Sequence, residues 1–125
     1  MNKLSVEDVM NLHKYMVGRY GGSTGMRDIG RLESVVASQS QKVFGLELYV
    51  SIPEKAAAMM RGIIQDHPFV DGNKRTGIMS AITLLEWNNL SFKADKQELE
   101  NFAVRVAVER LEIPEIASWL KTHCD

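Results

Sequence analysis

The apolar residues of this chain recur mostly at steps of three and four residues, and this spacing constrains the fold more than any other feature. Such spacing places apolar side chains along one face of a helix. It predicts helices over residues 6–20, 28–41, 53–66, 73–87 and 96–111, and a short last one from residue 114. Residues 73–87 are apolar nearly all round, so we expect that helix at the centre of the core. We therefore predict an all-α fold, a compact bundle of about six helices.

Size and composition indicate one ordinary globular domain. The 125 residues suit a single domain over residues 1–125, and 45% apolar with 25% charged residues argues against disorder. The formal net charge of −1 gives no global attraction to nucleic acid or to an anionic membrane, so we expect neither as a partner. No targeting or membrane-spanning stretch is visible, and we expect a cytoplasmic protein. The one cysteine, Cys124, excludes an internal disulfide.

Local signals refine the first two helices and the loop between them. Ser5, with Asp8 three residues on, is an N-cap candidate, and Asp28 can cap the second helix. His13 lies on the first apolar stripe, which favours a hydrogen-bonded core histidine over a ligand. Residues 20–25 contain three glycines and must form a loop. Residue types alone favour a flexible connection there over a backbone that approaches a ligand.

Residues 43–52 show a different period. Apolar side chains alternate there with other residues, at Phe44, Leu46, Leu48, Val50 and Ile52. Period two predicts a half-covered extended segment. No second stretch of this kind offers a partner strand, so its exposed edge could pair with another chain.

The segment 67–77, His-Pro-Phe-Val-Asp-Gly-Asn-Lys-Arg-Thr-Gly, joins the third predicted helix to the central one. Lys74 and Arg75 open a helix whose first amides lack partners, Gly72 permits a tight turn, and Asn73 can cap. Free amides and two cations favour an anion such as phosphate. On these four residues alone, a phosphate cradle and a solvated surface turn are equally good interpretations.

Two further residues make the phosphate interpretation more specific. The imidazole of His67 can accept a proton near neutral pH. The carboxylate of Asp71 suits a phosphate site only with a cation between them, and Mg²⁺ binds one or two carboxylates together with substrate phosphates. Phe69 alternates with these two residues and is expected to anchor the loop in the core. A base, a Mg²⁺ ligand and a phosphate cradle are what transfer of a phosphate-containing group to a hydroxyl requires.

The segment resembles the signature of the Fic/Doc family, His-Pro-Phe-x-(Asp/Glu)-Gly-Asn-Gly-Arg-x-x-Arg, at nearly all fixed positions. The rest of the chain resembles the Doc branch, the death-on-curing toxins, which are similarly short all-α proteins. That branch carries Tyr-Gly-Gly-x-x-Gly-x-x-Asp-x-Gly, found here from Tyr20 to Gly30 with Asp28 in place. The resemblance favours a functional loop over a merely flexible connection here, but assigns it no role.

Two departures from the general Fic pattern bear on the reaction. Lys74 stands where Fic enzymes have glycine, and Ile78 where they have a second arginine. In Fic enzymes that glycine and arginine help to bind nucleotide so that AMP is transferred. Lysine fills part of the anion pocket, and isoleucine cannot replace a bidentate phosphate clamp. Both changes are shared with the Doc branch, whose members resemble kinases that move the γ-phosphate of ATP. AMP transfer to a protein hydroxyl is the alternative, and a non-catalytic nucleotide- or partner-binding module is a third reading.

The resemblance also implies residue roles. His67 and Asp71 would be catalytic, with His67 as the base on the target hydroxyl. Asp71 would hold Mg²⁺ or help to position the target. The phosphates of ATP would be bound by Gly72, Asn73, Lys74 and Arg75. The extended stretch would serve as the target-aligning flap, through Leu46, Leu48 and Val50.

Partners follow from the same resemblance. The target would be a Ser/Thr hydroxyl, in elongation factor Tu, and its modification would arrest translation. No inhibitory Ser/Thr-x-x-x-Glu-Gly/Asn motif is present, so restraint would come from a cognate antitoxin that folds onto the toxin.

Overall fold

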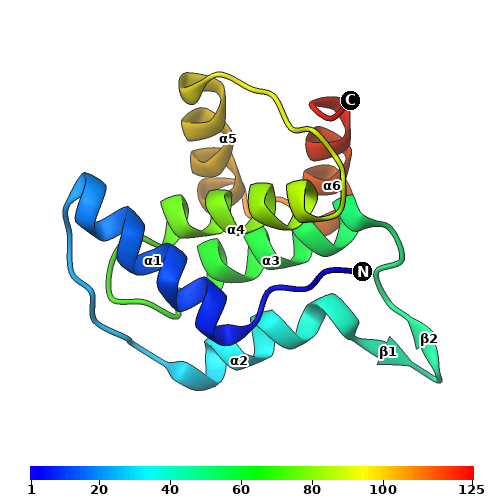
Figure 1. Cartoon of the computed structure of the whole chain (residues 1–125), viewed down its shortest axis with the longest axis horizontal. Coiled ribbons are helices and arrows are strands. Elements are labelled where there is room, and N and C mark those ends of the chain that lie inside the picture. Colours follow the sequence, from blue (N-terminus) through cyan, green and yellow to red (C-terminus); the bar gives the residue numbers. More distant parts are fainter.

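A computed structural model describes all 125 residues and contains six α-helices (Figure 1). They are α1 (Val6–Tyr20), α2 (Ile29–Ala37), α3 (Ile52–Asp66), α4 (Asn73–Trp87), α5 (Lys96–Val108) and α6 (Ile113–Thr122). A 3₁₀ turn (Ser38–Ser40) and two short strands, β1 (Lys42–Val43) and β2 (Leu46–Glu47), lie between α2 and α3. The predicted all-α fold of about six helices is confirmed. None of the helices combines the length and apolar content that a membrane span requires.

The core is built on the antiparallel pair α3 and α4, which lie side by side at the centre of Figure 1. α3 presents three consecutive buried alanines, Ala56–Ala58, and α4 presents Gly77. A Cβ atom at Gly77 would lie 2.8 Å from Ile64 Cγ1 and 3.2 Å from the Met60 carbonyl oxygen. Such a contact is too short for a real side chain, so the absence of one lets the two helices approach closely. This close pair fixes where the loop between α3 and α4 emerges.

The predicted caps are present, while two helix ends differ from the prediction. The Ser5 and Asp8 side chains form a capping box, and the Asp28 carboxylate accepts a hydrogen bond from the Arg31 amide at 3.1 Å. α2 ends at Ala37 and continues to Ser40 only as a 3₁₀ turn, and α5 ends at Val108 where residue 111 was expected. The backbone is left-handed at Arg110, which ends helical geometry.

The extended stretch 43–52 is corrected by the structure, because it folds back on itself. Lys42 pairs with Glu47 and Val43 with Leu46 in an antiparallel hairpin. The turn residues Phe44 (φ 52°) and Gly45 (φ 79°) both have positive φ, as a tight hairpin turn requires. This turn within the alternating run supplies the partner strand that the sequence seemed to lack. The hairpin is also exposed rather than half-covered, and Phe44 is 100% exposed.

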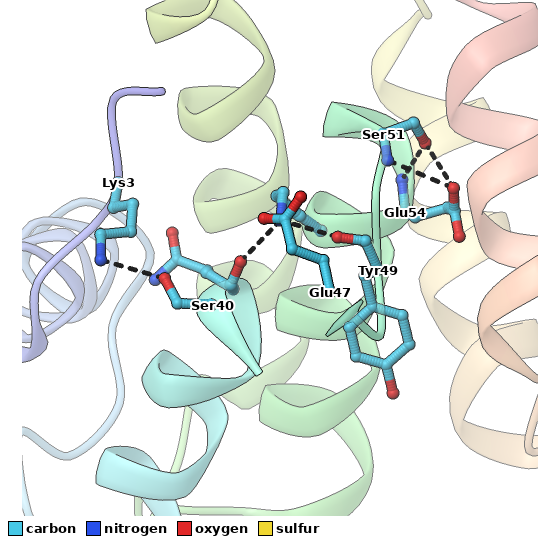
Figure 2. Close-up of polar contacts among 8 residues, drawn as sticks. Lys3, Ser40, Glu47, Tyr49, Ser51 and Glu54 are labelled. Carbon is cyan, nitrogen blue, oxygen red and sulfur yellow. Dashed lines mark hydrogen bonds and ion pairs between the residues drawn. The ribbon is translucent and has the colours of Figure 1, made fainter. Parts of the chain in front are cut away.

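A buried lysine, Lys55, anchors the hairpin to the first turn of α3, and Figure 2 labels its partners Glu47 and Tyr49. Lys55 is 3% exposed, and its ammonium donates to the Gln39 carbonyl at 2.9 Å, the Tyr49 carbonyl at 2.7 Å and Glu47 Oε1 at 2.9 Å. Three acceptors, one of them charged, offset the cost of burying the cation. Next to it, Ser51 and Glu54 form the capping box that starts α3. The hairpin is thereby fixed at the amino-terminal end of α3.

Because of the Lys55–Glu47 pair, we expect the free energy of unfolding to fall as the pH is lowered. The hydrogen bond and charge of Lys55 hold the pKa of Glu47 below its ordinary value of 4.5. A carboxyl whose pKa is lower in the folded state stabilises it above the unfolded pKa, and this contribution is lost as pH falls through the folded pKa. In urea unfolding from pH 6 to about pH 3, the variant Glu47→Gln should lose less stability than the wild type. The exposed Glu33→Gln control should follow the wild type, and a Glu47→Gln curve parallel to the wild type would contradict the role of the pair.

Candidate active site

The loop 67–72 leaves α3 and enters α4 through two left-handed residues. Pro68 disfavours helical geometry at the preceding residue, and α3 ends at Asp66 as predicted. His67 then has φ 50° and ψ 60°, an uncommon conformation for a residue with a Cβ atom. Gly72, with φ 76°, is the N-cap position of α4. Backbone held in a sparsely populated region is found most often at functional sites.

A stacked pair of rings holds the loop against the core. Phe69 is 2% exposed, which confirms its predicted role as an anchor. The His13 ring lies parallel to it with centroids 3.8 Å apart, and His13 Nε2 lies 2.8 Å from the carbonyl oxygen of Asp71. The prediction of a hydrogen-bonded core histidine is therefore confirmed. Since His13 belongs to α1, this contact fixes the loop relative to the first helix.

Asn73 does not cap α4 as expected. Its side-chain nitrogen donates to the Phe69 carbonyl at 2.9 Å, and its oxygen accepts from the Phe69 amide at 3.1 Å. The same nitrogen lies 3.5 Å from His67 Nδ1, a contact too long to fix the tautomer of that ring. The side chain is therefore committed to the shape of the loop. No side chain caps α4, so its first amides are open to an anion.

The glycine loop 20–25 lies beside this turn, a position that the sequence did not reveal. Val70 donates its amide to the Gly25 carbonyl at 3.0 Å, and the amides of Arg27 and Asp28 both donate to the Pro68 carbonyl, at 2.9 and 3.0 Å. Met26 and Phe69 form an antiparallel bridge. Residues 25–28 are thus an extended segment paired directly with the 67–71 loop.

Gly22 permits a close approach to the predicted metal ligand. A Cβ atom there would lie 2.6 Å from Asp71 Oδ2, and its φ of +115° also disfavours any other residue. The amide of Ser23 donates to Asp71 Oδ2 at 3.4 Å, and the amide of Gly72 donates to Asp71 Oδ1 at 2.8 Å. Backbone amides on both oxygens fix the orientation of this carboxylate.

A cleft of about 490 Å³ opens where the loop meets α4 and α5. His67, Asp71, Gly72, Asn73, Lys74 and Arg75 all line it, so the structure brings together every predicted catalytic and phosphate-binding residue. The remaining lining residues are Val70, Ile78, Glu100, Ala103 and Val104. Glu100 was not predicted, because no motif marks it within the amphipathic helix α5. Lys74 and Arg75 have no carboxylate within 4 Å, so their charges are available to an anion.

The structure does not bring the predicted flap to this cleft. Leu46, Leu48 and Val50 precede α3, whereas His67 follows it, and the 15 residues of α3 span about 22 Å. Figure 1 shows the hairpin and the α3–α4 loop at opposite ends of the helix pair. Alternating apolar residues indicate extended backbone but not its place in the fold. The segment that pairs with the motif loop is instead residues 25–28.

Comparison with known proteins adds to this geometry. Residues 3–85 match the sequence model of the Fic/DOC family. The chain belongs to the Fic/Doc family. It is 34% identical over 103 residues to "Toxin Doc" of Mycolicibacterium smegmatis, covering 81% of this chain and 79% of the relative. It is 31% identical over 121 residues to "Protein kinase doc" of Escherichia phage P1, covering 97% and 94%. Both relatives carry the name Doc, which confirms the resemblance to that branch.

In this Fic/Doc protein, both departures from the general Fic signature lie at the cleft. Lys74 is exposed on the first turn of α4, and Ile78, 8% exposed, lies one turn further into the same wall. The two substitutions therefore change the charge and shape of one wall of the cleft.

Asn73 gives a direct test of how the loop is held. Asn73→Ala leaves the amide and carbonyl of buried Phe69 without partners, which should lower the free energy of unfolding by about 1–3 kcal/mol. Amide hydrogen exchange at Phe69 should also accelerate. The control Asn101→Ala removes only an exposed contact with Gln97 and should change stability by less than about 0.5 kcal/mol. Equal effects of the two variants in urea unfolding would contradict the proposed role of Asn73.

Proposed function

We propose that this protein is a Doc-like toxin that transfers the γ-phosphate of ATP to a Ser/Thr hydroxyl of a target protein. The observation that carries the proposal is the cleft, where the residues of the family signature converge with Lys74 and Ile78 in place of glycine and arginine. The relative named "Protein kinase doc", which matches 97% of this chain, supports the same reaction.

The phosphates would bind at the amino-terminal end of α4. Its first amides have no side-chain cap, and the helix dipole favours negative charge there. The left-handed turn at Gly72 leads the backbone into this position, and Lys74 and Arg75 add two unpaired cations. Asn73 would contribute its backbone amide, since its side chain is bonded to Phe69.

Asp71 would hold Mg²⁺. No three His, Cys, Asp or Glu side chains gather anywhere in the structure, so a metal ion here would take its other ligands from phosphates and water. This is the mode of binding that suits Mg²⁺, and the fixed carboxylate of Asp71 fits it. When bound, the ion would neutralise charge on the phosphates.

His67 would act as the general base. Its imidazole lines the cleft and would take the proton from the target hydroxyl as the hydroxyl oxygen attacks the γ-phosphorus. A bond forms between these two atoms, the bond from the γ-phosphorus to the β,γ-bridging oxygen breaks, and ADP leaves. Pro68 restricts the backbone of His67, and the side-chain nitrogen of Asn73 lies 3.5 Å from Nδ1 of the ring.

Lys74 and Ile78 favour phosphate transfer over AMP transfer. The general Fic signature has a second arginine at the position of Ile78, and an apolar side chain cannot clamp a phosphate there. Nucleotide bound without that clamp would be held by Lys74, Arg75 and the amides of α4. We therefore assign the γ-phosphate, not AMP, as the group transferred.

The partners proposed from the family resemblance are a protein substrate, elongation factor Tu, and a cognate antitoxin. The relative named "Toxin Doc" supports the existence of an antitoxin. Modification of elongation factor Tu would arrest translation and would place the protein in the cytoplasm.

Incubation with labelled ATP and Mg²⁺ tests the reaction. Label from the γ position should reach the target protein, and label from the α position should not. His67→Ala should lower the rate by about 10²- to 10⁴-fold while its unfolding curve stays close to that of the wild type. His123→Ala, a variant of a histidine on the distant α5–α6 side, should remain active.

Two outcomes would overturn the proposal. Label that enters only from the α position would show AMP transfer, the alternative reaction. No label from either position, together with growth arrest that persists in His67→Ala cells, would identify a non-catalytic binding module.

A further inference from the structure

Three cations from three helices converge on one aromatic ring at the edge of the cleft. The ring is that of Tyr20, the last residue of α1. Arg75 Cζ of α4 lies 4.7 Å from its centroid, Lys96 Nζ of α5 lies 5.3 Å away and Arg19 Cζ of α1 lies 5.7 Å away. All three distances are within the range at which a cation is attracted to the face of an aromatic ring.

None of these cations has a carboxylate within 4 Å. Like charges repel, so three unpaired cations need an attraction that gathers them, and the electron-rich face of Tyr20 supplies one. The cluster lies next to the open amino-terminal end of α4, where the dipole adds further positive potential. An anion bound there would relieve all of these repulsions at once.

The backbone after Tyr20 leads directly to Asp71. Gly21 has φ 88° and Gly22 has φ 115°, and Gly22 lies against the carboxylate of Asp71. The segment Tyr20–Gly22 therefore touches two predicted functional groups, the Arg75 guanidinium through the ring and the Asp71 carboxylate through the backbone. This gives the first three positions of the glycine motif a physical role.

We propose that Tyr20 is a positioning residue that holds the Arg75 guanidinium toward the phosphates of bound nucleotide, and that Arg19 and Lys96 extend the phosphate-binding site beyond α4. This inference rests on the proposed function, since it requires ATP in the cleft. Cation–π contacts set the direction of Arg75, and the ring itself makes no bond to the phosphates. This arrangement should increase the binding affinity most for nucleotides with a long phosphate chain, and it should not change the affinity for adenosine.

Binding measurements by calorimetry test the proposal with two probes, adenosine 5′-(β,γ-imido)triphosphate and adenosine. Tyr20→Leu should raise the Kd for the triphosphate by about 5-fold or more and leave the Kd for adenosine unchanged. Tyr20→Phe keeps the ring and should bind like the wild type. Tyr15→Leu, at another exposed tyrosine of α1 with no cation on its ring, is the matched control and should also bind like the wild type.

Three further variants separate the proposed roles from general structural damage. In an Arg75→Ala background, Tyr20→Leu should have a smaller effect on the triphosphate Kd than in the wild type, because the guanidinium that it positions is gone. Lys96→Gln removes an exposed charge without altering the ring and should weaken binding of the triphosphate alone. Lys93→Gln, which removes a charge paired with Asp125 near the carboxyl terminus, should leave binding unchanged.

Each contrary outcome has a distinct meaning. Unchanged triphosphate binding by Tyr20→Leu, or equal weakening of adenosine and triphosphate, would overturn the role of Tyr20. Lys96→Gln binding like the wild type would overturn the extended phosphate site. A wild-type protein that binds the triphosphate no more tightly than adenosine would instead overturn the proposed function itself.

Discussion

The hydrogen bonds between residues 25–28 and the 68–70 backbone are the constraint on which the rest of the site depends. A single carbonyl, that of Pro68, accepts from both Arg27 and Asp28, and the Val70 amide donates to Gly25. Asn73 closes the same loop from within, and His13 holds the Asp71 carbonyl from α1. These bonds hold His67 in a left-handed conformation that a residue with a Cβ atom seldom adopts, in a turn completed by the left-handed Gly72. This turn places the imidazole of His67, the Asp71 carboxylate and the first amides of α4 along one cleft.

Charge is distributed unevenly around that cleft. None of the four cations Lys74, Arg75, Arg19 and Lys96 has a carboxylate partner. All but Arg19 lie in the first turn of a helix, where cations are unfavourable. This arrangement destabilises the free protein locally and favours a bound polyanion. At the other end of α3, the buried Lys55 instead satisfies its ammonium with three acceptors. Four unpaired cations around one cleft favour the binding of an anion there.

Features that depend on neighbours in the chain were predicted from the sequence. The six helices, the caps at Ser5 and Asp28, the break at Pro68 and the core positions of His13 and Phe69 all follow from spacing and residue type. Features that depend on which distant segments of the chain come together were not predicted. Glu100 and Tyr20 reach the cleft because α5 and α1 border it, and the alternation of residues 43–52 gave no indication that the hairpin lies at the other end of α3. Asn73 was expected to cap a helix, but the loop before it offered better-placed partners in Phe69.

The central claim is that this cleft moves a phosphate from ATP to a protein hydroxyl. Mass spectrometry of host proteins after brief induction tests it most directly, because it identifies the modified protein and the transferred group together. The account predicts a gain of phosphate on a serine or threonine of one abundant protein, absent when His67→Ala is induced. A gain of AMP in its place, or a modification that persists in the His67→Ala strain, would contradict it.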